Sequence, residues 1–168
     1  MIIVFEGLDG TGKTTTAEMF SDRTGWPLTK MSCASTHRYA IEEMSKVYNY
    51  VLFDLRRFNF VSDRAFLSTI VYHKVYRREF DISYIYDTLE LIKNDVIFVV
   101  FLYEQYRTSD NIIRPEYYDE IASSYKSVVK DLIAKQYNVI TVEKQFETVE
   151  DRIDYIIAEL RKKGVDVG

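Results

Sequence analysis

Residues 2–14 read IIVFEGLDGTGKT, a short apolar run followed by a glycine-rich turn, a lysine and a threonine. The continuous apolar run is typical of a strand that is buried on both faces of a parallel sheet. The turn fits the pattern G-x-x-x-x-G-K-[ST], from Gly7 to Thr14, without a mismatch. Because it lies between this strand and a helix expected over 13–23, the pattern predicts a loop that binds the phosphates of a nucleotide.

The residue types of this loop suit a bound phosphate. Glycines let the backbone curl so that successive N–H groups point at one anion, and the start of the following helix adds a positive dipole end. We expect Lys13 to reach the β- and γ-phosphate oxygens and Thr14 to bind Mg²⁺. The residues expected to contact the nucleotide are Gly7, Asp9, Gly10, Thr11, Gly12, Lys13, Thr14 and Thr15.

Strands and helices alternate along the rest of the chain. The expected strands cover 2–5, a short segment reached through 26–28, 58–61, 95–102 and 137–142. The expected helices cover 13–23, 35–53, 66–76, 82–93, 115–135 and 148–160, the last capped by Thr148. This alternation predicts an α/β fold of three layers, with a five-stranded parallel sheet flanked by helices. Ligands of such sheets bind at the carboxyl ends of the strands.

Composition limits the class of protein. The length of 168 residues and the hydrophobic content of 47% fit a single folded domain over 1–168. A net charge of −4 without a basic run argues against binding to long nucleic acid, although it does not exclude it. The single cysteine, Cys33, suits a reducing compartment. With no apolar run near the roughly 18 residues of a membrane span and no apparent signal peptide, we expect a cytoplasmic protein without membrane contact.

Two stretches resemble the thymidylate kinase family. Residues 5–15, FEGLDGTGKTT, are similar to the start of these enzymes, and Asp63-Arg64, followed by Phe66 and Ser68, resembles their second motif. The run from Val71 to Arg78 is similar to short, thymidylate-kinase-like phage proteins. The resemblance implies a P-loop NTPase fold, ATP and Mg²⁺ as cofactors, and the host cytoplasm as the location if the chain is phage-encoded.

The resemblance also implies roles for residues of the site. The loop with Lys13 would hold ATP, and Asp9 would contact the 3′-hydroxyl of the acceptor. Arg64 would bridge the donor and acceptor phosphates. Thr14 would bind Mg²⁺ directly and Asp63 through water.

Gly10 stands where some members of the family carry an arginine. Members with glycine there supply the arginine from a lid, which implies a short lid around 104–115 with Arg107 or Arg114 as the charge-neutralising residue. Phosphoryl transfer depends on such cancellation of charge on the moving oxygens.

One departure bears on the acceptor. The family usually carries Arg-Glu-Pro-Gly after its second strand, whereas this chain has KMSCAS at 30–35. Related deoxynucleoside kinases place there a glutamate that activates a 5′-hydroxyl, but no acidic residue lies between Asp22 and Glu42. A phosphate acceptor is already ionised and needs no base, so a monophosphate is favoured. The acceptor base stays open, with Tyr39, Phe53, Arg56, Arg57 and Phe58 as candidates for its pocket.

The leading hypothesis is transfer of the γ-phosphoryl group of ATP to a deoxynucleoside monophosphate, dTMP or a relative. A second hypothesis keeps the chemistry and takes as acceptor a deoxynucleoside, or a modified base or end within DNA. A third is a nucleotide-binding protein with little turnover that acts through a partner. The resemblance further implies a homodimer, for which the apolar faces of the helices expected over 66–76 and 82–93 are the candidates.

Overall fold

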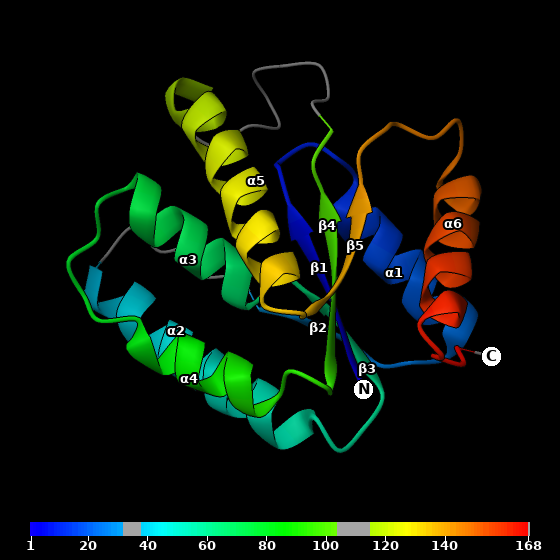
Figure 1. The fold of residues 1–168 in the computed structure, drawn as a ribbon, viewed down its shortest axis with the longest axis horizontal. Helices are drawn as coiled ribbons and strands as arrows, with labels where there is room; N and C mark the ends of the chain where they lie inside the picture. The colour runs from blue at the N-terminus through cyan, green and yellow to red at the C-terminus, as the bar shows by residue number, and fades with distance from the viewer. Residues whose placement is uncertain (32–37, 104–114, 168) are drawn as a thin grey trace.

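The computed structural model describes residues 1–31, 38–103 and 115–167, and its core is a five-stranded parallel sheet between layers of helices (Figure 1). The strand order is β2-β3-β1-β4-β5, so the strand that leads into the glycine-rich turn lies at the centre. This arrangement confirms the expected three-layer α/β fold. The strands are β1 (Ile2–Gly7), β2 (Leu28–Lys30), β3 (Phe60–Asp63), β4 (Val96–Phe101) and β5 (Asn138–Val142).

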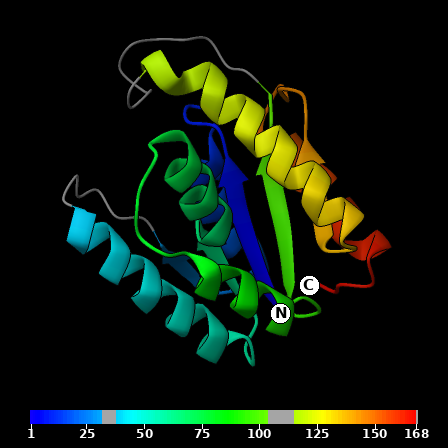
Figure 2. The ribbon, with the colours of Figure 1, turned by 60° about the vertical axis from the view of Figure 1, so that its left-hand side comes forward.

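Helices cover both faces of the sheet. Helices α1 and α6 pack together over one face, and α3 and α5 over the other, with α2 and α4 packed together beside α3 (Figures 1 and 2). The helices are α1 (Lys13–Thr24), α2 (Arg38–Leu55), α3 (Phe66–Val75), α4 (Ser83–Leu91), α5 (Tyr118–Ala134) and α6 (Val149–Lys162). None of the helices in the described part of the chain is long and apolar enough to span a membrane.

The central strands supply both halves of the core. Successive side chains of a strand point to opposite faces of the sheet. Accordingly Ile2 and Val4 pack in the core beneath α3 and α5, whereas Ile3 and Phe5 pack beneath α1 and α6. Burial on both faces explains why these strands read as continuous apolar runs rather than as alternating ones.

The element boundaries differ from expectation by a few residues, for example at the third strand, α2 and α5. The third strand covers Phe60–Asp63 rather than 58–61, because Phe58 belongs to the turn after α2 and is 65% exposed. The described part of α2 begins at Arg38 and continues to Leu55. The expected helix over 115–135 opens with a 3₁₀ turn, η1 (Pro115–Tyr117), before α5 begins.

The start of α6 confirms the expected cap. The Thr148 hydroxyl accepts a hydrogen bond from the Asp151 backbone N–H at 3.0 Å, and the Asp151 carboxylate accepts one from the Thr148 N–H. This reciprocal capping box satisfies two N–H groups that a helix start leaves unpaired.

The faces proposed for a homodimer are not available on the surface. Ile70 and Val71 of α3 and Ile85 and Leu89 of α4 are buried within the core. The expectation that these apolar faces meet a partner is therefore wrong, because the fold itself uses them. The homodimer stays a prediction without an assigned face.

Gly7 ends the central strand in a conformation that only glycine tolerates. Its φ is +121°, and a Cβ atom placed on it would lie 2.1 Å from the backbone oxygen of Phe101. We expect Gly7→Ala to lower the free energy of unfolding by at least about 3 kcal/mol, since neither backbone can move without breaking the β1–β4 ladder. Chemical denaturation of the two proteins measures this difference.

Gly164→Ala is the matched control. Gly164 also has a positive φ, of +78°, but a Cβ atom there would meet nothing within 4 Å. Its replacement should cost only about 1 kcal/mol, for the backbone conformation alone. Equal losses at the two glycines would contradict the close approach of β1 and β4.

Candidate active site

The glycine-rich turn follows the central strand at the carboxyl edge of the sheet. It connects the end of β1 at Gly7 to the start of α1 at Lys13, and Gly10 and Gly12 adopt φ angles of 75° and 77°. Gly12 is the N-cap of α1 and has no side-chain cap. The first N–H groups of α1 can therefore bind an anion, whereas within the turn the Leu8 N–H already donates to the Phe101 carbonyl at 3.2 Å.

Lys13 lies under the turn rather than in solvent. Its side chain is 5% exposed, and Nζ donates to the backbone carbonyl of Leu8. Burial, together with repulsion from Arg64, lowers the pKa of Lys13 to about 7. An anion in the turn would favour the ammonium form, so ligand binding and protonation of Lys13 are coupled.

Thr14 and Asp63, the expected Mg²⁺ residues, lie side by side. The Thr14 hydroxyl donates to Asp63 Oδ2 at 2.7 Å, and the Lys30 ammonium approaches the same oxygen to 3.9 Å. The described residues contain no cluster of three or more histidine, cysteine, aspartate or glutamate side chains that could hold a metal ion. A hydroxyl beside one carboxylate nevertheless fits Mg²⁺, which takes few protein ligands and completes its shell with water and phosphate oxygens.

Arg64 turns away from the end of β3 into the site. It has a φ of 66°, unusual for a residue other than glycine, and its N–H donates to the Phe5 carbonyl at 2.9 Å. Its guanidinium forms an ion pair with Asp9, both side chains being mostly buried. Asp9 and Arg64, predicted from separate stretches of sequence, are therefore brought together, and the partner of Arg64 is Asp9 rather than its neighbour Asp63.

Two tyrosines enclose the Arg64 guanidinium. Nη1 donates to the Tyr125 hydroxyl at 3.2 Å, and the guanidinium carbon lies 5.7 Å from the centre of the Tyr72 ring. Burial lowers the pKa of Arg64, but its interactions with Tyr125, Tyr72 and Asp9 outweigh burial, so the net shift is upward. Arg64 is therefore a permanent cation in this site.

Glu6 is a site residue to which the sequence analysis gave no role. It is completely buried, and Oε1 accepts from the backbone N–H groups of Ala65, Leu67 and Ser68 at 2.8, 3.1 and 3.2 Å. Burial raises its pKa, against the opposing effects of Arg64 and these hydrogen bonds. An acidic residue inside an otherwise apolar central strand was the available signal, since such a group needs buried partners.

Arg152 and Tyr103 also contact the turn, and of these two the sequence analysis missed Arg152, whereas Tyr103 lies at a carboxyl strand end, where ligands of such sheets bind. Arg152 of α6 donates to the Thr11 carbonyl at 3.1 Å and to the Thr16 hydroxyl at 2.9 Å, and the Tyr103 hydroxyl donates to the same Thr11 carbonyl. No local pattern could reveal these contacts, because Arg152 lies 141 positions from Thr11.

Further predicted site residues lie outside the described part of the structure or, in one case, on the surface of α1. Arg107 and Arg114, with the expected lid, lie outside the described residues, as does the side chain of Tyr39. Thr15 lies in the first turn of α1 with an exposed side chain.

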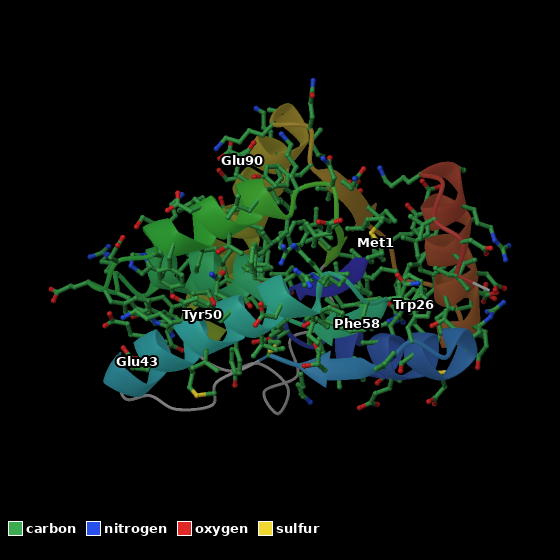
Figure 3. All side chains as sticks on the ribbon, turned by 90° about the horizontal axis from the view of Figure 1, so that it is seen from below. Met1, Trp26, Glu43, Tyr50, Phe58 and Glu90 are labelled. Carbon is green, nitrogen blue, oxygen red and sulfur yellow. The ribbon has the colours of Figure 1, made fainter. Side chains whose placement is uncertain are left out.

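The expected base pocket is wrong where the structure describes it. The carbonyls of Arg56 and Phe58 accept from the amino group of Met1, at the amino edge of the sheet seen in Figure 3. Arg56 stacks on the Phe53 ring at this same edge, 3.7 Å from its centre. These residues precede β3, and the starts of parallel strands lie opposite the edge that carries the phosphate loop.

The lowered pKa of Lys13 predicts a pH effect on stability. Between the folded pKa of about 7 and the ordinary value of 10.5, the unfolded chain binds a proton that the folded chain has lost. The free energy of unfolding therefore rises with pH in this window, by up to about 1.4 kcal/mol per unit. We expect the free energy of unfolding of wild type, minus that of Lys13→Met, to rise with pH across this range. Urea denaturation of both proteins at each pH measures it.

Lys163→Met controls for the loss of a lysine, since Lys163 is exposed at the end of α6. Parallel stability curves for wild type and Lys13→Met across the same pH range would show that Lys13 keeps its ordinary protonation in the folded protein.

Comparison with known proteins assigns a family to this site. No protein-family profile matches the chain. The chain is, however, 30% identical over 163 residues to a protein named as a candidate thymidylate kinase from Acidianus bottle-shaped virus (isolate Italy/Pozzuoli). The alignment covers 83% of this chain and 93% of the viral protein.

Solved structures share the fold. The YorR protein of Bacillus subtilis, in complex with phosphorylated GDP, has a TM-score of 0.75 at 19% identity and covers 99% of this chain and 100% of its own. Deoxyadenosine kinase from M. mycoides has a TM-score of 0.67 at 18% identity, covering 96% and 100%. Thymidylate kinase from Candida albicans has a TM-score of 0.58 at 14% identity, covering 97% and 92%. By its viral relative and this shared fold, the chain belongs to the thymidylate kinase family of P-loop kinases, enzymes of nucleotide phosphoryl transfer.

Proposed function

We propose that the protein transfers the γ-phosphoryl group of ATP to a deoxynucleoside monophosphate, dTMP or a close relative, and releases the diphosphate. The observation that carries this proposal is the ion pair between Asp9 of the phosphate loop and Arg64, near Lys13 of the same loop. The loop offers N–H groups and a lysine to a donor triphosphate, and the pair offers an arginine and a carboxylate to an acceptor.

The donor side of the site suits ATP. In the proposed complex, Lys13 exchanges the Leu8 carbonyl for phosphate oxygens, and the N–H groups at the start of α1 face the same phosphates. Thr14 and Asp63 would hold Mg²⁺, which supplies further neutralisation of charge. Arg107 or Arg114 of the lid would approach the transferred group, a role that remains a prediction for both residues.

The acceptor side suits a phosphate group. Arg64 presents a planar guanidinium that can bind two phosphate oxygens in parallel. When it does so, Asp9 becomes free to accept a hydrogen bond from the 3′-hydroxyl of the acceptor sugar. Both roles follow the family resemblance, and both need the two side chains to be adjacent before the substrate arrives.

The charges nearby favour a monophosphate over a nucleoside. Activation of a 5′-hydroxyl needs a free base, whereas a phosphate is already ionised. The carboxylates of Asp9 and Asp63 are occupied by Arg64 and by Thr14, and that of Glu6 binds the start of α3. At the carboxyl end of β2 stands Lys30, a cation that would stabilise an acceptor phosphate.

The deciding assay follows ADP release from ATP and Mg²⁺ with each candidate acceptor. The acceptors are dTMP, dUMP, dGMP, dAMP, dCMP, thymidine, deoxyadenosine and a short DNA duplex, with Lys13→Ala as the inactive control. Turnover with a monophosphate, abolished in the control, is the expected result and names the base. Turnover with a nucleoside or phosphorylation of DNA would contradict the monophosphate assignment. No ADP release with any acceptor would contradict the proposal that the protein is catalytic.

Arg64→Lys tests the bridging role of the guanidinium. Lysine keeps the charge but cannot bind two phosphates in a fixed planar geometry. We expect kcat with the monophosphate acceptor to fall by about 100-fold, with ATP affinity nearly unchanged.

Arg57→Lys provides the matched control, because Arg57 is exposed at the amino edge of the sheet and should leave kcat unchanged. A fall in kcat of less than about threefold in Arg64→Lys would contradict a transition-state role for the guanidinium.

A further inference from the structure

We propose that Arg152 is a positioning residue, which fixes the phosphate loop in the conformation that binds the donor nucleotide. Arg152 belongs to α6, at the far end of the chain from the loop, and the family resemblance assigns it no role. It is 7% exposed, although arginine is seldom buried without a strong partner. The inference rests on the proposed function in one respect, that the loop holds a nucleoside triphosphate.

The guanidinium binds three oxygens of the loop and of the first turn of α1. Nη1 lies 3.1 Å from the Thr11 carbonyl oxygen, 3.4 Å from that of Gly12, and 2.9 Å from the Thr16 hydroxyl. The guanidinium carbon lies 5.8 Å from the centre of the Phe101 ring, so the group is also held over β4. One rigid side chain thus joins the loop, α1, the sheet and α6.

These contacts orient the N–H groups that face a ligand. In a trans peptide the carbonyl and the N–H point in opposite directions. Fixing the carbonyls of Thr11 and Gly12 toward Arg152 therefore aims the N–H groups of Gly12 and Lys13 away from it, toward the phosphate side of the loop. The Tyr103 hydroxyl, which donates to the Thr11 carbonyl as well, supports the same orientation.

Close packing leaves little freedom for this arrangement. A Cβ atom placed on Gly12 would lie 2.7 Å from Nη1 of Arg152, so only glycine allows the arginine to approach the backbone. Gly12 is therefore needed both for its φ of 77° and for this contact. Gly12 and Arg152 therefore depend on each other, because the arginine can take this position only where the loop residue has no side chain.

The charge of Arg152 is not neutralised by a carboxylate within the described residues, where no ion pair of this arginine occurs. Its Nε is buried without a hydrogen-bond partner in the same part of the chain. With no carboxylate partner among the described residues, this buried cation raises the positive potential on its side of the loop. Donor phosphates bound across the same peptide groups provide the compensating charge, so Arg152 favours the occupied loop over the empty one.

The test compares Arg152→Met with Arg152→Lys in the full chain. Calorimetry gives the Kd of a non-hydrolysable ATP analogue, kinetics give KM for ATP and for the acceptor, and a thermal melt checks folding. We expect Arg152→Met to weaken binding of the analogue by about tenfold to a hundredfold, the effect of losing a charged hydrogen bond. KM for ATP should rise in parallel, KM for the acceptor should stay unchanged, and Arg152→Lys should recover part of the loss.

Arg161→Met is the matched control, since Arg161 lies on the same helix and is exposed. A folded Arg152→Met variant that binds the analogue as wild type does would overturn the positioning role. So would equal increases of KM for ATP and for the acceptor, with no recovery in the lysine variant. If the methionine variant does not fold, the Kd of the analogue and the two KM values are measured for Arg152→Lys instead. Values equal to those of wild type would then overturn the positioning role. Failure of the wild type to bind the analogue would instead overturn the proposed donor.

Discussion

The buried carboxylate of Glu6 connects the scaffold to the reactive groups. It sits on the central strand, binds the N–H groups that open α3, and accepts a hydrogen bond from the Tyr125 hydroxyl of α5 at 3.3 Å. A buried charge is tolerable only when its hydrogen-bonding capacity is met, and the start of a helix meets it with aligned donors. Because Tyr125 also binds Arg64, the same network fixes the arginine relative to β1.

Around this network, positive charge is concentrated near the loop although the whole molecule is acidic. The chain carries a net charge of −4, yet the loop region gathers the cations Lys13, Lys30, Arg64 and Arg152. Lys13, Lys30 and Arg64 lie near the carboxylates Glu6, Asp9 and Asp63, whereas Arg152 has no carboxylate partner among the described residues. A site that is cationic within an acidic protein suits a small anionic ligand better than a long polyanion, which needs an extended basic surface. The overall composition could argue only against a long polyanion, and it could not reveal the local cationic site.

The sequence predicted what depends on neighbouring residues and failed where distant segments meet. The five-stranded parallel sheet, the glycine-rich loop and the Thr148 cap follow from alternating apolar runs and helices, glycine spacing and a local capping pattern, whereas the strand order β2-β3-β1-β4-β5 was not predicted. The contacts of Glu6 and Arg152 join segments 59 and 141 positions apart, which one sequence without an alignment cannot pair. The base pocket failed for a topological reason, since Phe53 and Phe58 precede a parallel strand and so lie at the wrong edge of the sheet.

The Asp9–Arg64 pair gives the proposed reaction a physical basis for choosing its acceptor. The two mostly buried charges of Arg64 and Asp9 satisfy each other. A deoxynucleoside monophosphate can replace both partners at once, with its phosphate on Arg64 and its 3′-hydroxyl on Asp9. A nucleoside can replace only one, and would leave the guanidinium buried without an anion, a loss worth roughly 3–5 kcal/mol when a buried pair is broken. Selectivity for the phosphorylated acceptor then comes from the penalty on the wrong substrate, in addition to any attraction for the right one.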